Sequence, residues 1–394
     1  MNIRRPHNLF LALAAILLLS ACRTDDYIVY TEDEDTGVKA AQTEVVGMYL
    51  LNEGNMGSNK CTLDYLDLSG SLGGTIHYLR NIYAERNPNE VKELGDVGND
   101  IQVYSDQLWI VVNCSHKVEV CRAADAVKIA KIDVPNCRNV VFADGYAYVS
   151  SYVGPVAVSG DAPQGRVYKI DTRSFQIVGT VTVGYQPEEM AVVGQKLYVA
   201  NSGGYRAPDY DRTVSVVDLP TFTEERKIDV AVNLQRCEAD RYGQVWVSSR
   251  GDYFDNPSRL CWLQPDANGS MQKAGQIDVP VSEMCIVGDS LYYIGVSFNY
   301  NTMRNEVSFG IVNVRSHQVV TTQLTPAAEA LSMTLPYGII VNPYQRDFYL
   351  MDAKDYVSSG ELLHFRADGT FDYRVWTGDI PAHAVFIFKK TEQQ

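Results

Sequence analysis

A pattern of four short strands, repeated along the chain, constrains the fold more than any other feature of the sequence. The clearest copy lies between Pro187 and Val230, where four apolar runs either alternate with polar residues or are rich in β-branched residues. Such runs, bounded by Gly, Pro, Asp or Asn, are typical of strands, and Gly194-Gln195 indicates a tight turn between the first two. The sheet they form has two apolar faces, so it needs further copies on either side. The four runs are Met190–Val193, Lys196–Ala200, Thr213–Leu219 and Glu225–Val230.

The apolar centre of the second strand recurs at seven places in the chain. The spacing is that of β-propeller blades, on the order of 40 to 55 residues, and not that of a helical solenoid. We therefore expect an all-β fold, a propeller of seven blades. The seven centres are Met48–Leu50, Leu108–Ile110, Ala147–Val149, Leu197–Val199, Val245–Val247, Leu291–Ile294 and Phe348–Leu350.

The two ends of the repeat region complement each other. The first copy, Val45–Leu51, has no inner strand before it, whereas the last copy is followed by a surplus apolar segment, Pro381–Phe388. We expect the C-terminal strand to pair into the first blade, because this closes the ring and leaves no open sheet edge. The propeller is then expected to occupy residues 45–394.

The N-terminal segment has the composition of an export signal. A basic pair precedes an apolar run, Leu9–Leu19, that is too short to span a bilayer and is followed by Ser20-Ala21-Cys22. This ending resembles the bacterial lipobox and predicts that residues 1–21 are a lipoprotein signal peptide and that Cys22 is lipidated. An ordinary secretory signal with a coincidental Cys is the alternative.

The residues after Cys22 are acidic. Asp25-Asp26 resembles the surface-export signal of Bacteroidetes lipoproteins, and no Asp follows Cys22 directly, so a common signal for retention in the inner membrane is absent. The segment Thr31–Lys39 is acidic and poor in apolar groups, which favours a flexible connection. We expect residues 22–44 to form an acidic tether.

Composition limits the classes of partner. The formal net charge is −14, with 48 acidic and 34 basic residues and no basic run. Nucleic acid is therefore not expected as a partner, because phosphate binding needs clustered Lys and Arg.

No local motif indicates catalysis or a metal. The six His are scattered, no CxxC pair is present, and the Ser-hydrolase, zinc-protease and P-loop motifs are missing. We expect no enzyme activity, no cofactor and no metal site. Seven Cys remain besides Cys22, mostly within strand patterns, where a buried apolar role is usual; pairing of Cys114 with Cys137 stays open.

The loops between the second and third strands carry the predicted binding site. In a propeller these loops share one face with the connections between blades, and here most of them are long, including Val296–Glu306. They contain many aromatic rings beside amides and guanidinium groups, which suit a large flat ligand with many hydrogen-bonding groups. The candidate residues, including one near the ring centre, are Tyr152, Asn201, Tyr205, Arg206, Tyr210, Arg236, Arg250, Tyr253, Phe254, Phe298, Asn299, Tyr300 and Tyr356.

Repeats such as QKLYVANSGG, RTVSVVDL and FTEERKIDV resemble those of the YncE-like seven-bladed propellers over most of residues 45–388. Together with the lipobox, the acidic pair and the Tyr/Asn/Arg loops, the chain is similar to the cobalamin-binding surface lipoproteins of the BtuG type in gut Bacteroidetes. That resemblance implies a lipid-anchored protein on the outer surface of the outer membrane. It also implies that cobalamin (vitamin B12) or another corrinoid is bound and passed to a TonB-dependent outer-membrane transporter.

Two other classes of function fit the same sequence. One is an enzyme, a propeller lyase or glycan-active surface protein, which would need an acid–base pair or a metal near the ring centre, for example around Glu188 and His383. The other is an interaction scaffold whose loop face binds only protein.

Overall fold

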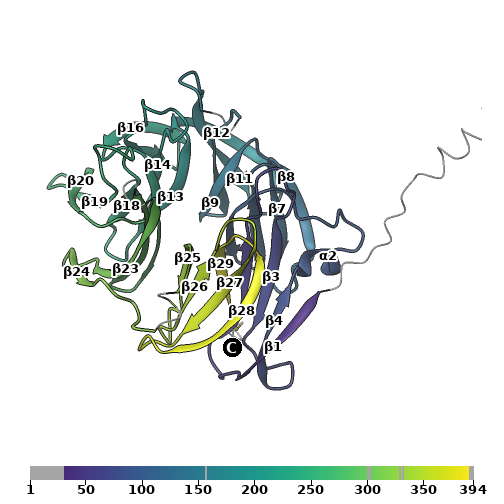
Figure 1. Ribbon diagram of the computed structural model, residues 1–394. Helices are drawn as coiled ribbons and strands as arrows, with labels where there is room; N and C mark the ends of the chain where they lie inside the picture. The colour runs from purple at the N-terminus through teal and green to yellow at the C-terminus, as the bar shows by residue number, and fades with distance from the viewer. Residues whose placement is uncertain (1–30, 156–157, 300–302, 328–329, 331, 390–394) are drawn as a thin grey trace, which may run out of the picture.

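The computed structural model describes residues 31–155, 158–299, 303–327, 330 and 332–389. These residues form seven antiparallel sheets arranged in a ring, with one short helix, α2 (Ile82–Arg86), in the described part (Figure 1). The prediction of a seven-bladed β-propeller is therefore confirmed. The predictions for the signal peptide and for Cys22 lie outside the described residues.

Each blade is one sheet whose strands are neighbours in chain order, except in the blade that joins the two ends. Blade 1 contains β1 (Glu32–Lys39), β2 (Val45–Asn52), β3 (Thr62–Asp67), β4 (Thr75–Arg80) and β29 (Pro381–Phe388). Blades 2 to 4 contain β5 (Gly98–Tyr104), β6 (Gln107–Val112), β7 (Lys117–Arg122) and β8 (Lys128–Asp133); β9 (Cys137–Ala143), β10 (Tyr146–Ser151), β11 (Gln164–Asp171) and β12 (Ile177–Tyr185); and β13 (Pro187–Val193), β14 (Lys196–Asn201), β15 (Thr213–Asp218) and β16 (Thr223–Asp229).

Blades 5 to 7 have the same arrangement. They contain β17 (Leu234–Ala239), β18 (Val245–Ser249), β19 (Arg259–Pro265) and β20 (Met271–Ile277); β21 (Glu283–Val287), β22 (Ser290–Asn299), β23 (Arg304–Asn313) and β24 (Gln318–Thr321); and β25 (Pro336–Val341), β26 (Phe348–Asp352), β27 (Ser359–Phe365) and β28 (Phe371–Asp379).

The ring is closed by the C-terminal strand, as the sequence predicts. Strand β29 pairs antiparallel with β2, so that Val45 lies opposite Phe388 and Leu50 lies opposite Ala384. The first blade therefore takes its inner strand from the far end of the chain, and the backbone hydrogen bonds of this pair hold the two ends of the ring together.

The acidic segment before the ring differs from the prediction. Residues 32–39, expected as part of a flexible tether, form β1, which pairs with the outer strand β4 of blade 1. The reason is that β4 offers unpaired backbone groups and cationic side chains. Arg80 contacts Glu32 and Glu34 at 3.0 and 2.7 Å, and the Nδ1 atom of His77 lies 2.8 Å from Asp33.

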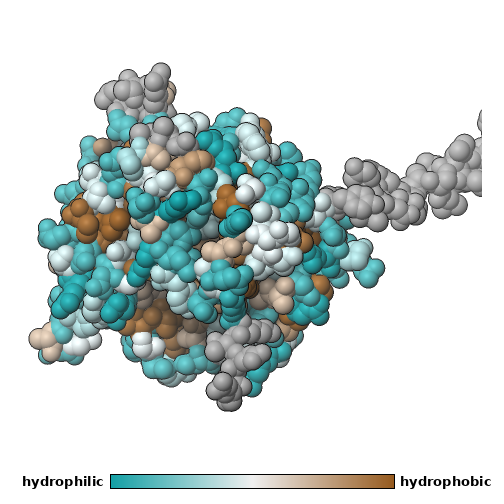
Figure 2. Space-filling model, turned by 90° about the horizontal axis from the view of Figure 1, so that it is seen from below, coloured by the Kyte–Doolittle hydropathy of each residue, from teal (hydrophilic) through white to brown (hydrophobic). Residues whose placement is uncertain are grey.

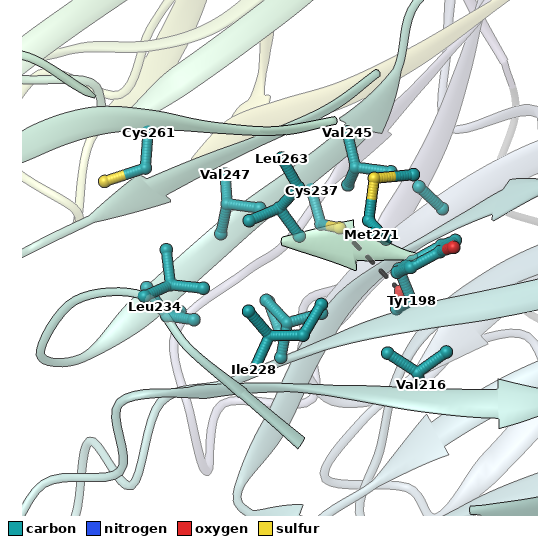
Figure 3. Close-up of a cluster of buried hydrophobic side chains, with 14 of the residues drawn as sticks. Tyr198, Val216, Ile228, Leu234, Cys237, Val245, Val247, Cys261, Leu263 and Met271 are labelled. Atoms are coloured by element: carbon teal, nitrogen blue, oxygen red, sulfur yellow. Dashed lines mark hydrogen bonds between the residues drawn. The ribbon is translucent and has the colours of Figure 1, made fainter. Parts of the chain in front are cut away.

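The hydrophobic core lies between neighbouring blades. In the cluster between blades 4 and 5, Tyr198 and Ile228 of one sheet pack against Val247 and Leu263 of the next (Figure 3). Cys237 is buried in this cluster, with its Sγ atom 3.7 Å from the Tyr198 carbonyl oxygen. Because each sheet buries both faces only when two neighbours are present, the blades depend on one another for stability.

The seven described cysteines are free thiols, and five of them are buried. The open pairing of Cys114 with Cys137 is not formed, because the Sγ atom of Cys137 points to the carbonyl oxygens of Val112 and Lys117. The five buried thiols therefore act as small core residues, the role that their place in the strands favours.

Carboxylates on the inner strands connect successive blades. Asp100 accepts a hydrogen bond from the Val140 backbone N–H at 2.8 Å, and Glu189 accepts one from Cys237 at 2.9 Å. Glu238 repeats the contact with the Ile286 N–H at 3.0 Å. Each carboxylate satisfies a backbone donor that no strand covers on the channel side, so these acidic residues have a structural role.

One expected loop is part of a hairpin. The segment Val296–Glu306 was expected to be an irregular loop, but β22 and β23 pair as far as Asn299 with Arg304. The strand pattern continues through this segment, so β22 and β23, at ten residues each, are longer than the corresponding strands of blades 5 and 7. The surface seen in Figure 2 is mostly hydrophilic with separate apolar patches, and no described helix is long and apolar enough to cross a membrane.

Candidate functional site

The topology places all the long loops on one face of the ring. The inner strand of each blade begins, and its second strand ends, on this side, which we call the loop face. The connections from one blade to the next open here, as does the loop after each second strand. The opposite face carries tight turns such as Asp144-Gly145 and Gly194-Gln195. A rigid scaffold with variable loops on one side is the usual arrangement of a binding surface.

Two cavities enter the central channel from its two ends. The cavity at the opposite face has a volume of about 690 Å³ and includes Asp100, Glu238 and Glu283 in its wall. The cavity at the loop face, called the loop-face cavity below, has a volume of about 440 Å³. Asn139 and His383 belong to both walls, so the two cavities approach each other at the middle of the channel.

The wall of the loop-face cavity is rich in amides, guanidinium groups and tyrosine rings. Its polar and aromatic members are Glu53, Asn55, Asn99, Asn113, Arg138, Asn139, Tyr152, Glu188, Tyr205, Asn233, Gln235, Arg236, Arg250, Tyr253, Tyr337 and His383.

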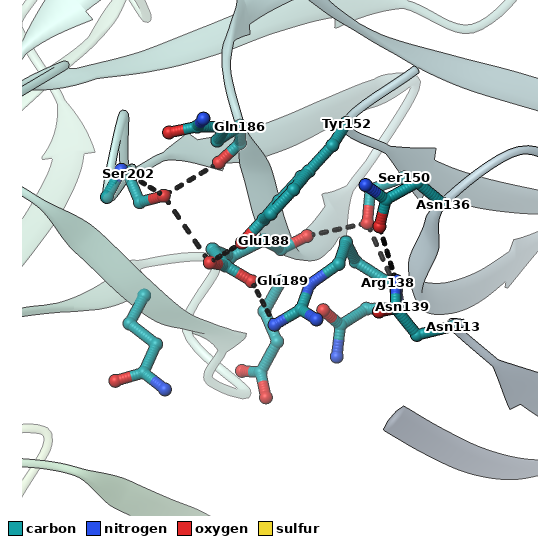
Figure 4. A network of polar contacts seen from close by, with 12 residues as sticks. Asn113, Asn136, Arg138, Asn139, Ser150, Tyr152, Gln186, Glu188, Glu189 and Ser202 are labelled. Atoms are coloured by element: carbon teal, nitrogen blue, oxygen red, sulfur yellow. Dashed lines mark hydrogen bonds and ion pairs between the residues drawn. The ribbon is translucent and has the colours of Figure 1, made fainter. Parts of the chain in front are cut away.

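A buried ion pair supports one side of this cavity (Figure 4). The Nε and Nη2 atoms of Arg138 both lie 3.1 Å from Oε2 of Glu188, and the guanidinium lies 4.8 Å from the centre of the Tyr152 ring. Tyr152 and Ser202 donate hydrogen bonds to the other carboxylate oxygen, Oε1. Burial alone would raise the pKa of Glu188, but the charges of Arg138 and Arg250 and the Tyr152 hydrogen bond outweigh it and leave the pKa below its usual value.

A second ion-paired group lies deeper in the channel. Arg236 is 9% exposed, and its guanidinium contacts Glu189 and Glu283 at 2.7 Å each. His383 lies 3.3 Å from Glu53. Burial raises the pKa of Glu283, and the Glu189 charge adds to this while Arg236 opposes it. The charges of Arg138 and Arg236 are thus matched by protein carboxylates.

Several predicted binding residues do line the loop-face cavity. Tyr205 and Tyr253 are 38% and 50% exposed, and the Tyr205 ring meets the Tyr152 ring edge-on at 6.2 Å. Arg250 is exposed, and Arg236 lies in the wall as described above. Tyr356 is 42% exposed and is not part of the wall, but it packs edge-on against Tyr337, which is.

Other predicted residues lie elsewhere. Asn201 is fully buried and its amide bonds Thr213, Ser215 and the Gly184 N–H, so it stabilises blade 4 and does not reach the cavity. Arg206 stacks on Tyr185 at 3.8 Å, outside the cavity wall.

Tyr210 is half-buried and is absent from the cavity wall, whereas Phe254 is 86% exposed and belongs to a neighbouring cavity. Phe298 and Asn299 lie in β22, where only the backbone is described, and Tyr300 lies outside the described residues.

The residue-by-residue prediction missed Tyr337, Asn233, Gln235 and Glu53 of the wall. Tyr337 and Gln235 are the second residues of inner strands β25 and β17, and Asn233 directly precedes β17. The signal that could have found them is their position, because residues at the start of an inner strand face the channel entrance on the loop side.

The residues considered for an enzyme lie in the same wall but are engaged with other groups. Glu188 is held by Arg138, Tyr152 and Ser202, and His383 contacts Glu53. No group of three or more His, Cys, Asp or Glu suited to a metal ion occurs among the described residues.

No protein-family model matches the chain, and no curated protein matches it. Solved structures do match it. A putative 6-phosphogluconolactonase from Bacteroides uniformis is 11% identical, with 88% of this chain and 100% of that chain covered and a TM-score of 0.59. A quinonprotein alcohol dehydrogenase-like protein from Bacteroides thetaiotaomicron is 12% identical, with 87% and 78% covered and a TM-score of 0.56.

Hydrazine synthase from Kuenenia stuttgartiensis is 13% identical, with 73% of this chain and 88% of that chain covered and a TM-score of 0.56. At such low identity these similarities show the propeller fold alone, since one fold serves many functions.

Proposed function

We propose that this protein is a surface lipoprotein that captures cobalamin or a related corrinoid at its loop face and passes it to a TonB-dependent outer-membrane transporter. The observation that carries the proposal is the composition of the loop-face cavity, where exposed tyrosine rings surround a mouth lined by side-chain amides. A corrinoid is a large, nearly flat ring with apolar edges and many side-chain amides. The tyrosine rings can therefore contact its apolar edges, and the amides of the wall can form hydrogen bonds with its amides.

The rigidity of the site supports tight capture. The wall residues come from the ends of inner and second strands of several blades, and the Arg138–Glu188 pair fixes the Tyr152 side chain in place. A site held in its binding conformation loses little entropy when the ligand docks. Tyrosine adds to this advantage, because it offers a large contact area with few rotatable bonds.

The charge of the protein fits the proposed partners. A net charge of −14 disfavours nucleic acid, and export with a lipidated Cys22 would place the ring beside membrane-embedded transporters.

Titration calorimetry with cyanocobalamin tests the proposal. The lipid-free chain beginning at Arg23 should bind one molecule per ring. Replacing Tyr205 or Tyr253 by Ala should weaken binding by about 1–3 kcal/mol each if these rings contact the ligand. Tyr242 is a matched control because it is 43% exposed, lies in the β17–β18 turn of the opposite face, and bonds Asp289.

Absence of binding in the unmodified chain would refute the corrinoid proposal. Binding that is unchanged in both tyrosine variants would show that the ligand lies elsewhere on the ring.

A further inference from the structure

A second cavity lies beside the loop-face cavity and shares part of its wall. This side cavity has a volume of about 460 Å³ and lies between the blade 5 loop, residues 250–258, and the start of blade 6. Arg250 and Tyr253 belong to both walls. The other groups that matter here are apolar: Phe254, Pro257, Pro280 and Val281.

The loop that forms the outer wall is internally braced. Asp252 accepts hydrogen bonds from the backbone N–H groups of Phe254 at 3.0 Å and Asn256 at 2.8 Å. Ser258 donates a hydrogen bond to the Arg250 carbonyl oxygen at 2.9 Å, which closes the base of the loop. The side cavity is therefore present before any ligand arrives, as most small-molecule sites are.

The wall that the two cavities share contains an arginine, Arg250, that can bind an anion. Arg138 and Arg236 are both ion-paired with buried carboxylates, as described above. Within the described part of the chain, Arg250 has no ion-pair partner, and its guanidinium donates only to the Gln235 side-chain oxygen. Its remaining N–H groups, on an exposed side chain, are free to bind an anion in a bidentate manner.

We infer that the ligand spans both cavities, with a planar aromatic base in the side cavity and an anionic linker on Arg250. The inference rests on the proposed function, because the nucleotide arm of cobalamin contains a phosphodiester that links a side chain of the corrin ring to a ribose bearing an aromatic base. The corrin ring then lies on the loop face across the mouth of the loop-face cavity, and the base below the ring enters the side cavity and contacts Phe254 and Pro257. Asp278 is the one carboxylate in the described wall of the side cavity.

Two corrinoids separate the contribution of the arm from that of the ring. Dicyanocobinamide has the corrin ring but lacks the phosphodiester and the base, so it leaves the side cavity empty. We expect the unmodified lipid-free chain to bind cyanocobalamin more tightly than dicyanocobinamide in titration calorimetry. Replacing Arg250 by Gln should weaken cyanocobalamin binding about 10- to 100-fold, the range for a charge-assisted hydrogen-bonded contact.

The same Arg250→Gln variant should bind dicyanocobinamide within about a factor of two of the unmodified chain. Phe254→Ala should behave in the same way, with a loss of at least about fivefold for cyanocobalamin alone. Retained binding of dicyanocobinamide also shows that each variant is folded. Arg241→Gln is the matched control, because this arginine is exposed in the β17–β18 turn of the opposite face, and it should change neither affinity.

The possible results separate the inference from the function on which it rests. If neither corrinoid binds the unmodified chain, the proposed function fails, and the ligand assigned to the side cavity fails with it. If both bind and the Arg250 and Phe254 variants weaken them equally, or weaken neither, the two-cavity arrangement is refuted while corrinoid capture stands.

Discussion

Replacing Arg138 by Met should turn the buried carboxylate of Glu188 into an uncompensated charge. In the native ring, two guanidinium nitrogens lie 3.1 Å from one oxygen of Glu188, whose side chain is 6% exposed. At an effective dielectric constant of about 20, one such contact corresponds to about 5 kcal/mol of attraction. Because the Arg138 side chain is 19% exposed, part of this is screened. We expect a loss of about 3 kcal/mol in unfolding free energy, at the lower end for breaking a buried pair.

The loss should depend on pH in a defined direction. In the native chain the folded-state pKa of Glu188 is lowered, so its stabilising contribution is present above the unfolded pKa of about 4.3 and is lost as pH falls through the folded value. Without Arg138, burial dominates and raises the folded-state pKa. A carboxyl group with a raised folded pKa gains stability as pH falls through that value, so the destabilisation should be smaller at pH 5 than at pH 7.5.

Urea unfolding followed by tryptophan fluorescence measures these differences. The double variant Arg138→Met/Glu188→Gln should recover much of the loss, because the neutral amide oxygen still accepts hydrogen bonds from Tyr152 and Ser202. Arg173→Met is the control, since its side chain is 90% exposed and its contact with Asp171 is 3.7 Å long, so its effect should stay below about 0.5 kcal/mol. An equal loss at both pH values, without recovery in the double variant, would refute the reasoning.

Three further outcomes follow from the structure. Truncation before β29 should abolish cooperative unfolding measured by calorimetry, whereas removal of residues 390–394 should leave it intact; a stable ring without β29 would contradict the closure argument. Gly251→Ala should weaken cyanocobalamin binding and lower stability by about 1–3 kcal/mol, because φ is +70° and the new Cβ would meet the Asn256 carbonyl oxygen; Gly269→Ala, whose Cβ meets nothing within 4 Å, is the control. Thiol titration of the lipid-free chain should count seven cysteines in guanidinium and fewer in the native state, since five are buried; a lower count in guanidinium would indicate disulfides.

The repeated strand centres were sufficient to predict the architecture. Each centre, such as Leu197–Val199, is a short apolar run between turn residues, and seven of them at blade spacing leave few alternatives. The closing strand was predictable for a related reason, because one blade lacked an inner strand and one surplus strand remained. Both inferences depend on local patterns and on the need to cover sheet edges.

The direction of loop side chains could not be predicted in this way. Tyr152 directly follows the second strand β10 and Asn201 is the last residue of the second strand β14, yet the tyrosine reaches the cavity wall and the asparagine turns into its own blade. That difference depends on contacts between residues distant in sequence, such as Tyr152 with Glu188. The strand at residues 32–39 was not predicted because its acidic composition, considered alone, favours disorder. The backbone pairing with β4 and the cations on β4 that stabilise it come from another part of the chain.

The direction of β1 has a consequence for how the ring is presented to a membrane. Glu32 lies opposite Arg80, the last residue of β4, and Thr31 donates a hydrogen bond to Glu85 of α2, so the chain joins the ring at the edge of the loop face. With Cys22 lipidated as proposed, the ten residues up to Glu32 can span at most about 35 Å. The cavity entrance is then confined near the bilayer. This short tether would raise the effective concentration of the ring around a transporter embedded in that bilayer. The association of the ring with the transporter would then need little intrinsic affinity.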